Sequence, residues 1–314
     1  MTTEVLDPRE ARGGAGRDGG PGAPGQLRPS ATAEINCAQR VAEMHRPPDA
    51  RLFEDPYARC FLQARRYRAL VAWGPLARLA LRAFDRRYPG LHVEIMLRNR
   101  VYERELARAL ATGVDQVVLL GAGYDSTSLR LDLGPATLYE LDAAPTQRAK
   151  LRALERLGKA ATGGVRYVEC DLEASGPRER LLAAGLDPGR RTFAASFGVL
   201  FYLSEAAVRR TLAEMAAVMA PGSRLVFDYL DESVVDGTTP YPGARRAEAA
   251  VRRRGEPYVF GLGPESAVEL ADSAGFAAYD HLRAPDLCER YGPPAGTWCS
   301  PDDYLGVLAT ERRP

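Results

Sequence analysis

Two glycines and an acidic residue follow a short apolar run in the segment Gln116 to Arg130, QVVLLGAGYDSTSLR. The run Val117–Leu120 has the character of a buried parallel strand, and Gly121-Ala122-Gly123 follows it directly. Glycine allows a tight turn and lets a ligand approach the backbone closely. Open α/β sheets bind nucleotide-like cofactors at such strand–helix turns. The segment therefore predicts a cofactor site at Gly121 and Gly123, with a ligand-free turn as the alternative.

The residue three positions after the second glycine separates two classes of cofactor. A dinucleotide fingerprint has the form G-x-G-x-x-G, and its third glycine allows close packing of helix and strand. Ser126 occupies that third position here. A cofactor without a pyrophosphate, such as S-adenosylmethionine, needs only the first two glycines. The turn therefore favours S-adenosylmethionine, and a nicotinamide-dependent oxidoreductase remains the alternative.

A second apolar run supplies carboxylates at a suitable distance from the glycines. The run TLYEL, at 137–141, reads as a strand that ends at Asp142. Glu140 and Asp142 lie roughly 20 residues past the glycines, where a carboxylate can accept hydrogen bonds from both ribose hydroxyls. Strand alternation places both side chains on one face, so either can do so. Asp142 is preferred because it is nearer the carboxyl end of the strand; a solvated loop charge is the alternative.

The elements that must position these residues alternate along the chain. Helices are expected at 31–46, at 61–87 with a break near Gly74-Pro75, and at 91–110. Alternation of strands with helices after residue 113 predicts an α/β, doubly wound, mostly parallel Rossmann-like sheet. The strands are expected at 117–120, 137–141, 165–170, 191–197, 224–229, 277–282 and, as a final edge strand, 304–310.

This pattern divides the chain into three parts. Residues 1–30 are rich in Gly and Pro and predict a disordered tail. Residues 31–112 predict a helical lid with a lead-in helix, and residues 113–314 the cofactor-binding α/β domain. Residues 231–260 look irregular and charged, and they predict a substrate insertion in that domain.

Composition limits the classes of partner. The 314 residues carry a net charge of +1, which gives no indication of nucleic acid or membrane as a partner. Arginine dominates the 42 basic residues, since only Lys150 and Lys159 are lysines, and it is spread along the chain. Five scattered cysteines predict reduced thiols in a cytoplasmic protein. His45, His92 and His281 are far apart in sequence, so no metal site is expected.

The ordered motifs resemble the leucine carboxyl methyltransferase-like family of class I S-adenosylmethionine-dependent methyltransferases, in particular its actinobacterial O-methyltransferase branch. The resemblance covers about residues 31–230. It rests on T-A-x-x-x-x-x-x-R at 32–40, L-F-x-D-P-Y-A at 52–58, R-x-R at 98–100, Q-V-V-L-L-G-A-G-Y-D at 116–125, Y-E-L-D-x-x-x-x-Q-x-x-K at 139–150, D-L at 171–172, G-V-L-F-Y-L at 198–203 and P-G-S-R-L at 221–225.

The resemblance implies S-adenosyl-L-methionine as the cofactor and assigns contacts to it. Gly121 and Gly123 would face its methionine part and Asp142 its ribose. The remaining contacts fall to Asp171 and Leu172 at the adenine, to Ser196 in the fourth-strand motif, and to Arg98 at the cofactor carboxylate. An arginine fork matches a carboxylate bidentately. The alternative for Arg98 is a surface helix arginine paired with Glu94 or Tyr102.

The chain departs from the family pattern at Phe197, where many relatives have Glu. No His or Asp in the matched motifs is poised as a general base, which favours a carboxylate acceptor over a phenol. Tyr202 follows the fourth strand and is a candidate for positioning the acceptor, with core packing as the alternative. The acceptor is expected to be a small molecule, such as a secondary metabolite, or a peptide. A non-catalytic protein of the same fold remains a further alternative. Aromatic residues of the lid are candidates for lining an apolar pocket: Phe53, Tyr57, Phe61, Tyr67 and Trp73.

Overall fold

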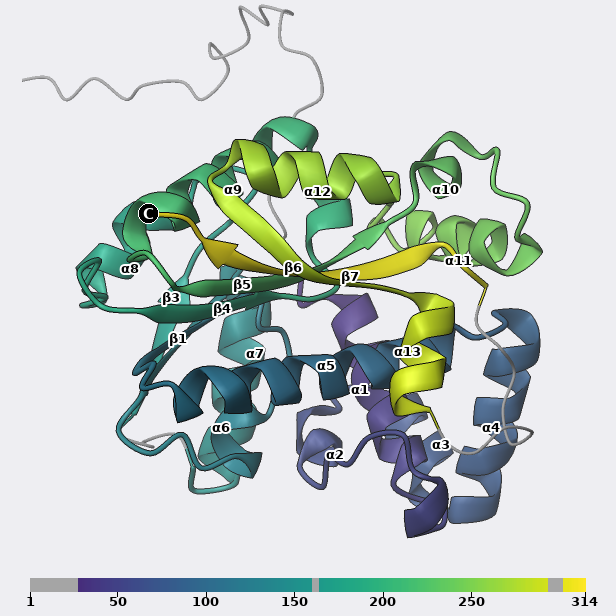
Figure 1. Ribbon diagram of the computed structural model, residues 1–314. Coiled ribbons are helices and arrows are strands. Elements are labelled where there is room, and N and C mark those ends of the chain that lie inside the picture. Colours follow the sequence, from purple (N-terminus) through teal and green to yellow (C-terminus); the bar gives the residue numbers. More distant parts are fainter. Residues whose placement is uncertain (1–27, 160–163, 293–301) are drawn as a thin grey trace, which may run out of the picture.

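The computed structural model describes residues 28–159, 164–292 and 302–314. Within these ranges seven strands form one sheet in the order β3-β2-β1-β4-β5-β7-β6 (Figure 1). The first five strands are parallel, and β7 runs antiparallel between β5 and β6. The strands are β1 (Gln116–Leu120), β2 (Thr137–Asp142), β3 (Val165–Glu169), β4 (Thr192–Ser196), β5 (Arg224–Leu230), β6 (Phe276–Arg283) and β7 (Leu305–Arg312). The doubly wound, mostly parallel sheet is confirmed.

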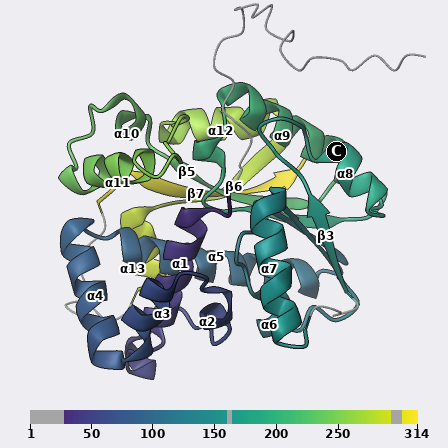
Figure 2. The ribbon, with the colours of Figure 1, turned by 180° about the vertical axis from the view of Figure 1, so that it is seen from behind.

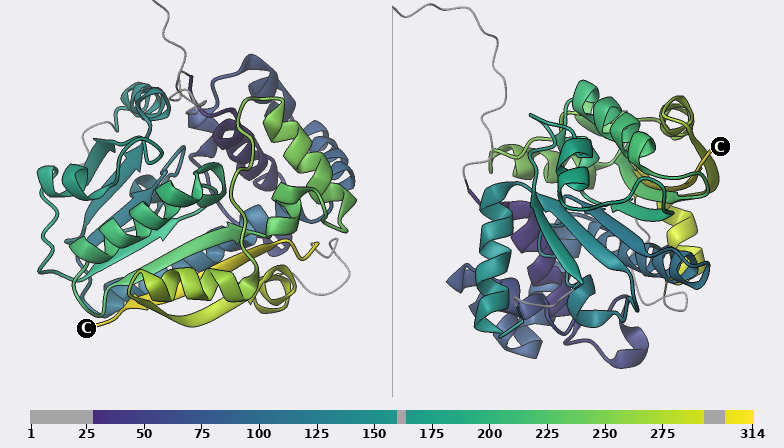
Figure 3. Two further views of the ribbon diagram at one scale, coloured as in Figure 1. Left: turned by 90° about the horizontal axis from the view of Figure 1, so that it is seen from above. Right: turned by 90° about the vertical axis from the view of Figure 1, so that its left-hand side faces the viewer.

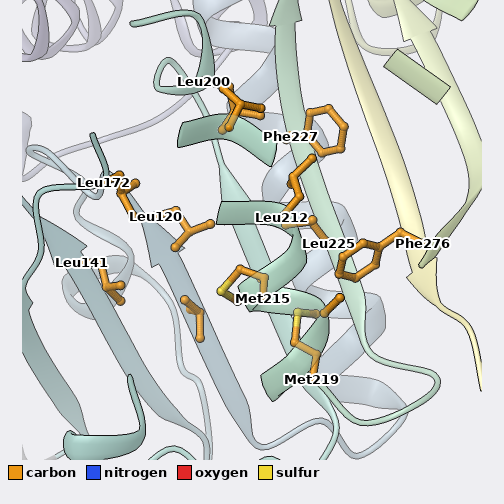
Figure 4. Close-up of a cluster of buried hydrophobic side chains, with 14 of the residues drawn as sticks. Leu120, Leu141, Leu172, Leu200, Leu212, Met215, Met219, Leu225, Phe227 and Phe276 are labelled. Atoms are coloured by element: carbon orange, nitrogen blue, oxygen red, sulfur yellow. The ribbon is translucent and has the colours of Figure 1, made fainter. Parts of the chain in front are cut away.

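Helices cover both faces of the sheet, which is why all five residues of β1 are buried. Val118 and Leu120 face a core built with α8 (Arg178–Ala183), α9 (Glu205–Val218) and α12 (Pro264–Ser273) (Figure 4). Val117 and Leu119 face the opposite core, which contains α5 (Leu91–Ala111) and α13 (Ala284–Tyr291). Alternation along a strand explains why neighbouring residues enter different cores.

The front of the chain, for which the name lid is kept, folds into helices with their own buried cluster; its action as a lid stays a prediction. The lid contains α1 (Ala31–Glu43), the 3-10 turn η1 (Pro48–Ala50), α2 (Ala58–Phe61), α3 (Arg65–Ala72) and α4 (Gly74–Arg87). The predicted break at Gly74-Pro75 separates α3 from α4, since proline fits the first turn of a helix but not its interior. The other helices are α6 (Thr127–Arg130), α7 (Ala144–Arg156), α10 (Glu232–Asp236), α11 (Pro242–Arg252) and the 3-10 turn η2 (Leu200–Tyr202).

Two expectations about the later part of the chain are wrong. The segment 231–260 is not irregular throughout, because it contains α10 and α11. Pro242 starts α11, and its buried alanines recur at helical spacing. The strand expected at 304–310 is not at an edge, because β7 pairs with both β5 and β6. Chain order does not fix the order of strands in a sheet, and an antiparallel strand can be inserted between two others.

The insertion lies against the lid at one end of the molecule (Figure 3). Arg246 in α11 donates from Nε to the backbone carbonyl of Arg87, at the end of α4, over 2.7 Å. This contact joins α11 to the end of α4, and both helices contribute residues to the pocket described below.

Some of the residues for which the sequence made predictions lie outside the described ranges. The predicted disordered tail, 1–30, lies outside them except for its last three residues. Cys299 also lies outside them, and the four described cysteines are free thiols. In the described part of the chain, no helix combines the length and the apolar character needed to cross a membrane.

Candidate functional site

The glycine turn follows β1 at the carboxyl ends of the parallel strands. Gly121 and Gly123 have φ of 65° and 50°, a left-handed conformation that favours glycine. A Cβ at Gly121 would stand only 2.4 Å from Cγ2 of Val199, so the position has no room for a larger residue. Ala122 donates its N–H to the carbonyl of Leu141 at the end of β2 over 2.8 Å. Conformation and crowding therefore both select glycine at 121.

Asp142 lies beside this turn, at the end of β2. Its Oδ2 accepts a hydrogen bond from the N–H of Gly123. Burial raises the pKa of the Asp142 carboxyl to about 6, although hydrogen bonds from Gly123 and Ala143 and the charge of Lys150 act in the opposite direction. Glu140 is buried in an ion pair with Lys150. With Glu140 paired in this way, Asp142 remains as the carboxylate next to the glycines.

The first two motifs of the lid hold the glycine turn in place. Nη2 of Arg40, in α1, donates to the carbonyl of Tyr124 over 2.6 Å. Nε of Arg40 lies 3.3 Å from Oδ2 of Asp55. The position where a Cβ of Gly123 would stand is 3.5 Å from Cβ of Ala33, near the start of α1. The T-A-x-x-x-x-x-x-R and L-F-x-D-P-Y-A motifs thus support the turn, a role that sequence reasoning did not assign.

Arg98 is 8% exposed in α5, so it is not a surface arginine, and its ion-pair partner is neither Glu94 nor Tyr102. Its Nη1 donates to Oδ2 of Asp228 in β5 over 2.6 Å. The N–H of Gly198, which follows β4, donates to the same carboxylate over 2.8 Å. A Cβ at Gly198 would stand 3.0 Å from Nη2 of Arg98. Asp228 was missed from the sequence, although a lone acid in the apolar run of β5 was a usable signal.

The other expected cofactor residues lie at the same edge of the sheet. Ser196 ends β4 beside Leu120, and its fully buried Oγ has no hydrogen-bond partner among the described residues. Asp171 is half-buried just after β3, and its Oδ1 accepts the N–H of Glu173 over 3.0 Å. Leu172 is buried in the core, and its carbonyl accepts a hydrogen bond from Arg210. Direct contacts of these residues with a cofactor stay predictions.

A pocket opens beside this edge, between the lid and the insertion. It encloses about 640 Å³ of space free of protein atoms, part of it open to solvent. Its walls come from α1, α4, α5, α11, η2, the start of β7 and the loops beside these elements. The described residues that line it are Thr32, Ile35, Asn36, Gln39, Phe84, Tyr88, Leu91, Ile95, Arg98, Gly198, Phe201, Tyr202, Ala247, Val251, Arg254, Tyr258 and Leu305.

The lid lines this pocket, but with different aromatic residues from those expected. Phe84 and Tyr88 take part, whereas Phe53 and Phe61 are buried in hydrophobic cores. Tyr57 and Tyr67 pack on the lid core, and Trp73 is exposed to solvent. The positions that face inward depend on how α4 packs on α5, which helix-spaced aromatics alone do not reveal.

Tyr202 lies in the pocket wall within an aromatic cluster. Its ring centroid is 4.9 Å from that of Phe201 and 5.4 Å from that of Tyr258. Burial, followed by the neighbouring Tyr258, raises the pKa of the Tyr202 phenol well above its usual value, so the hydroxyl stays protonated. Tyr202 can therefore donate a hydrogen bond in the pocket but is not suited to act as a base.

The residues present fit S-adenosyl-L-methionine. The glycine turn leaves backbone accessible, Asp142 offers a carboxylate for a ribose, and the unpartnered Ser196 hydroxyl is a free polar group at the same edge. Arg98 offers a guanidinium for a carboxylate. Among the described residues no group of three or more His, Cys, Asp or Glu side chains is arranged to hold a metal ion.

Comparison with known sequences gives a consistent result. Residues 33–216 match the family model described as leucine carboxyl methyltransferase. A Frankia alni protein named for S-adenosyl-L-methionine-dependent methyl transfer is 32% identical over 93% of this chain and 98% of its own length. A Mycobacterium sp. (strain KMS) protein of the same name is 29% identical over 90% of this chain and 95% of its own length.

Two solved structures share the fold. A DUF574 family protein from Streptomyces avermitilis has a TM-score of 0.57 at 15% identity, covering 88% of this chain and 97% of its own. A Thermobifida fusca protein described as a methyltransferase has a TM-score of 0.56 at 17% identity, covering 87% of this chain and 97% of its own. At such low identity these structures support the architecture alone.

Proposed function

Because the chain belongs to the leucine carboxyl methyltransferase family of S-adenosyl-L-methionine-dependent methyltransferases, we propose that it is an O-methyltransferase acting on a carboxylate. The acceptor is a small molecule, such as a secondary metabolite, or a peptide, with an apolar body that fits the aromatic pocket. Because the chain belongs to this family, we no longer consider a nicotinamide-dependent oxidoreductase as the alternative.

The composition of the pocket wall carries the proposal. Of the described residues that line the pocket, Arg98 and Arg254 are cationic, and none is Asp, Glu or His. A carboxylate acceptor is already ionised at neutral pH and needs no base, whereas a phenol with a pKa of about 10 would benefit from one. A guanidinium group in the wall attracts the first kind of acceptor, and the described lining offers no carboxylate or imidazole to deprotonate the second.

Arg254 is the better candidate to bind the acceptor. Its side chain is exposed at the pocket and forms no hydrogen bond or ion pair with the described residues. Arg98 is instead held by Asp228 beside Gly198, close to the glycine turn. We assign Arg98 to the carboxylate of the cofactor and Arg254 to that of the acceptor. Pairing with Arg254 would offset the negative charge of the acceptor carboxylate and so reduce the cost of its desolvation.

The remaining residues hold and orient the reactants. S-adenosyl-L-methionine supplies, when bound, a methyl group on a positively charged sulfur. Gly121 and Gly123 allow close approach of its methionine part, Asp142 accepts from its ribose, and Asp171, Leu172 and Ser196 complete its site. Tyr202 donates a hydrogen bond that orients the acceptor, and the aromatic wall excludes water. The protein therefore contributes mainly approach geometry and desolvation.

Calorimetry tests the cofactor half of the proposal. S-adenosylhomocysteine should bind the wild-type protein. It should bind Gly123→Arg far more weakly, because the added side chain meets Ala33. Asp142→Ala should bind more weakly. No binding to the folded wild-type protein would contradict the assignment of the site.

The acceptor half is tested by the chemistry of the product. The enzyme is incubated with methyl-labelled cofactor and matched panels of carboxylic acids, their amides and phenols. A methyl ester releases labelled methanol in mild alkali, whereas a methyl ether does not. We expect alkali-labile label from the acids alone. Alkali-stable label from the phenols would overturn the carboxylate assignment, and binding without transfer to any panel member would favour the non-catalytic alternative.

A further inference from the structure

The helical hairpin α3–α4 exposes large apolar side chains. Trp73 is 65% exposed, Leu76 37% and Leu79 57%. These three lie within seven residues of one another, whereas the other exposed large apolar side chains of the described chain are scattered: Leu157, Leu182, Val259 and Tyr279. A cluster of exposed apolar side chains marks a surface with a partner more often than single ones do.

The same hairpin carries a local excess of positive charge. Between residues 65 and 87 there are seven arginines against one acid, Asp85, and all seven are exposed. They are Arg65, Arg66, Arg68, Arg78, Arg82, Arg86 and Arg87. The net charge of +1 for the whole chain conceals this cluster, so the expectation that arginine is merely spread along the chain is wrong for this segment.

Among the residues that the structure describes, these arginines lack the acidic partners that many other arginines have. Arg209 pairs with Glu205, Arg252 with Glu248 and Arg290 with Asp280. Within the described part of the chain, none of the seven hairpin arginines pairs with a carboxylate; Arg68 and Arg78, for example, donate to backbone carbonyls instead. The charge of the hairpin is therefore available to a partner.

We propose that this α3–α4 face, formed by Trp73, Leu76, Leu79 and the seven arginines, docks on the surface of an anionic lipid bilayer. Tryptophan favours the level of the lipid headgroups, and leucines can enter the acyl boundary. Arginine forks pair with lipid phosphates, and each basic residue near an anionic surface adds attraction. A nucleic acid would satisfy the arginines but leave exposed leucines without a partner, so a bilayer fits the face better.

The position of the hairpin is compatible with docking. Both views of the ribbon show α3 and α4 at the periphery of the molecule, away from the sheet (Figure 2). Phe84, also in α4, lines the pocket. Docking would thus place one wall of the pocket close to the bilayer. Because docking requires no methyl transfer, it can be tested independently of the proposed function.

Flotation of the full chain with lipid vesicles tests the inference. One vesicle preparation is phosphatidylcholine alone, and the other contains equal parts of phosphatidylcholine and phosphatidylglycerol. We expect the protein to float with the anionic vesicles and not with the neutral ones, and the binding to weaken as salt is raised. The triple variant Arg65→Gln, Arg82→Gln, Arg86→Gln should bind on the order of a hundredfold more weakly.

Variants in which exposed leucines are replaced by serine separate the contribution of insertion into the lipid from the contribution of charge. Leu76→Ser with Leu79→Ser should weaken binding roughly tenfold or more, since two exposed leucines no longer enter the lipid. Leu157→Ser with Leu182→Ser removes two leucines of similar exposure elsewhere and should leave binding unchanged. Unchanged thermal midpoints and unchanged affinity for S-adenosylhomocysteine show that the variants are folded.

Three results would overturn the proposal. One is failure of the wild-type protein to float with anionic vesicles at low salt. A second is equal binding by the wild-type protein and the arginine variant. The third is charge-dependent retention of a double-stranded oligonucleotide without vesicle binding, which would assign the face to nucleic acid.

Discussion

Asp142, at the end of β2, accepts a hydrogen bond from the backbone N–H of Gly123 in the turn that follows β1. Two residues 19 positions apart in the chain are thereby joined at one edge of the sheet. The bond uses one oxygen of a half-buried carboxylate and fixes its orientation toward the turn. The ionisation of that carboxylate should therefore control cofactor binding.

Cofactor affinity should fall in mild acid. The pKa of Asp142 is raised to about 6, so the carboxyl is ionised at pH 8 and largely protonated at pH 5. If only the ionised form accepts both ribose hydroxyls, affinity for S-adenosylhomocysteine should be about tenfold weaker at pH 5 than at pH 8. Calorimetry across this range measures the change. Asp142→Asn should bind S-adenosylhomocysteine more weakly and lose most of the pH dependence of the affinity. Parallel pH profiles of affinity for the wild-type protein and the variant would contradict the prediction.

The same pKa shift has the opposite consequence for stability. Burial raises the carboxyl pKa from 3.8 in the unfolded chain, so the folded state holds its proton more tightly. The Asp142 contribution to the free energy of unfolding should therefore decrease as pH rises from about 4 to about 6. Urea titrations without ligand measure the free energy of unfolding at each pH. In Asp142→Asn this free energy should lack the decrease between about pH 4 and about pH 6. A decrease of the same size in the variant would show that another group causes it.

Gly121→Ala should lower the free energy of unfolding more than Gly158→Ala, although the two glycines have similar backbone conformations. Gly121 has φ of 65° and crowds Val199, whereas Gly158 has φ of 66° and no atom of the described residues within 4 Å of its Cβ position. Gly158→Ala should cost about 1 kcal/mol from backbone strain alone. Gly121→Ala should cost about 3 kcal/mol, because a steric clash is added. Adding Val199→Ala should recover part of the difference in urea titrations; equal costs for the two single variants would refute the crowding argument.

Arg98→Met should lose stability and cofactor affinity for separate reasons. It leaves Asp228 buried without its cation, which should cost about 3 kcal/mol. The double variant Arg98→Met, Asp228→Asn removes both charges and should recover much of that stability. If Arg98 binds the cofactor carboxylate, affinity for S-adenosylhomocysteine should remain low in the double variant. Recovered affinity would show that Arg98 acts only by holding Asp228.

Glu256→Gln should loosen the start of the lid. The Glu256 carboxylate accepts from the N–H groups of Ala31 and Thr32, both over 3.0 Å, and from the Thr32 hydroxyl. A carboxylate at a helix N-terminus is stabilising, so its neutralisation should cost about 1 kcal/mol. Faster amide hydrogen exchange at the first turn of α1 is the expected signal, with α9 as an internal reference. Unaltered exchange in α1 would show that the contact contributes little.

Arg254→Gln should impair the acceptor without affecting the cofactor. Loss of a charged hydrogen bond should raise KM for a carboxylate acceptor about tenfold to a hundredfold. Affinity for S-adenosylhomocysteine should not change. Arg253→Gln is the matched control, since this neighbouring arginine is also exposed but does not line the pocket. Similar effects of the two substitutions would argue for general electrostatics rather than a specific contact.

Much of the cofactor half of the site was predictable from local patterns. The run before Gly121, the two glycines and the acid ending the next strand follow from rules that operate within a few residues, since strand and turn propensities are local. The alternation of strands and helices then fixed the doubly wound sheet. The preference for Asp142 over Glu140 was also local, because it rested on the position of Asp142 at the end of the strand. The ion pair between Glu140 in β2 and Lys150 in α7, which gives a second reason for that preference, is visible only in the tertiary structure.

The sequence by itself determined the fold class, the family and the edge of the sheet where the cofactor is expected to bind. Only the tertiary structure decided which side chains form the pocket, because its walls come from segments separated by more than 200 residues, from Thr32 to Tyr258. It also showed that Arg98 is paired with Asp228 and that the α3–α4 arginines have no acidic partners among the described residues. Pairing and exposure depend on which surfaces meet when helices pack, and neither periodicity nor net charge contains that information.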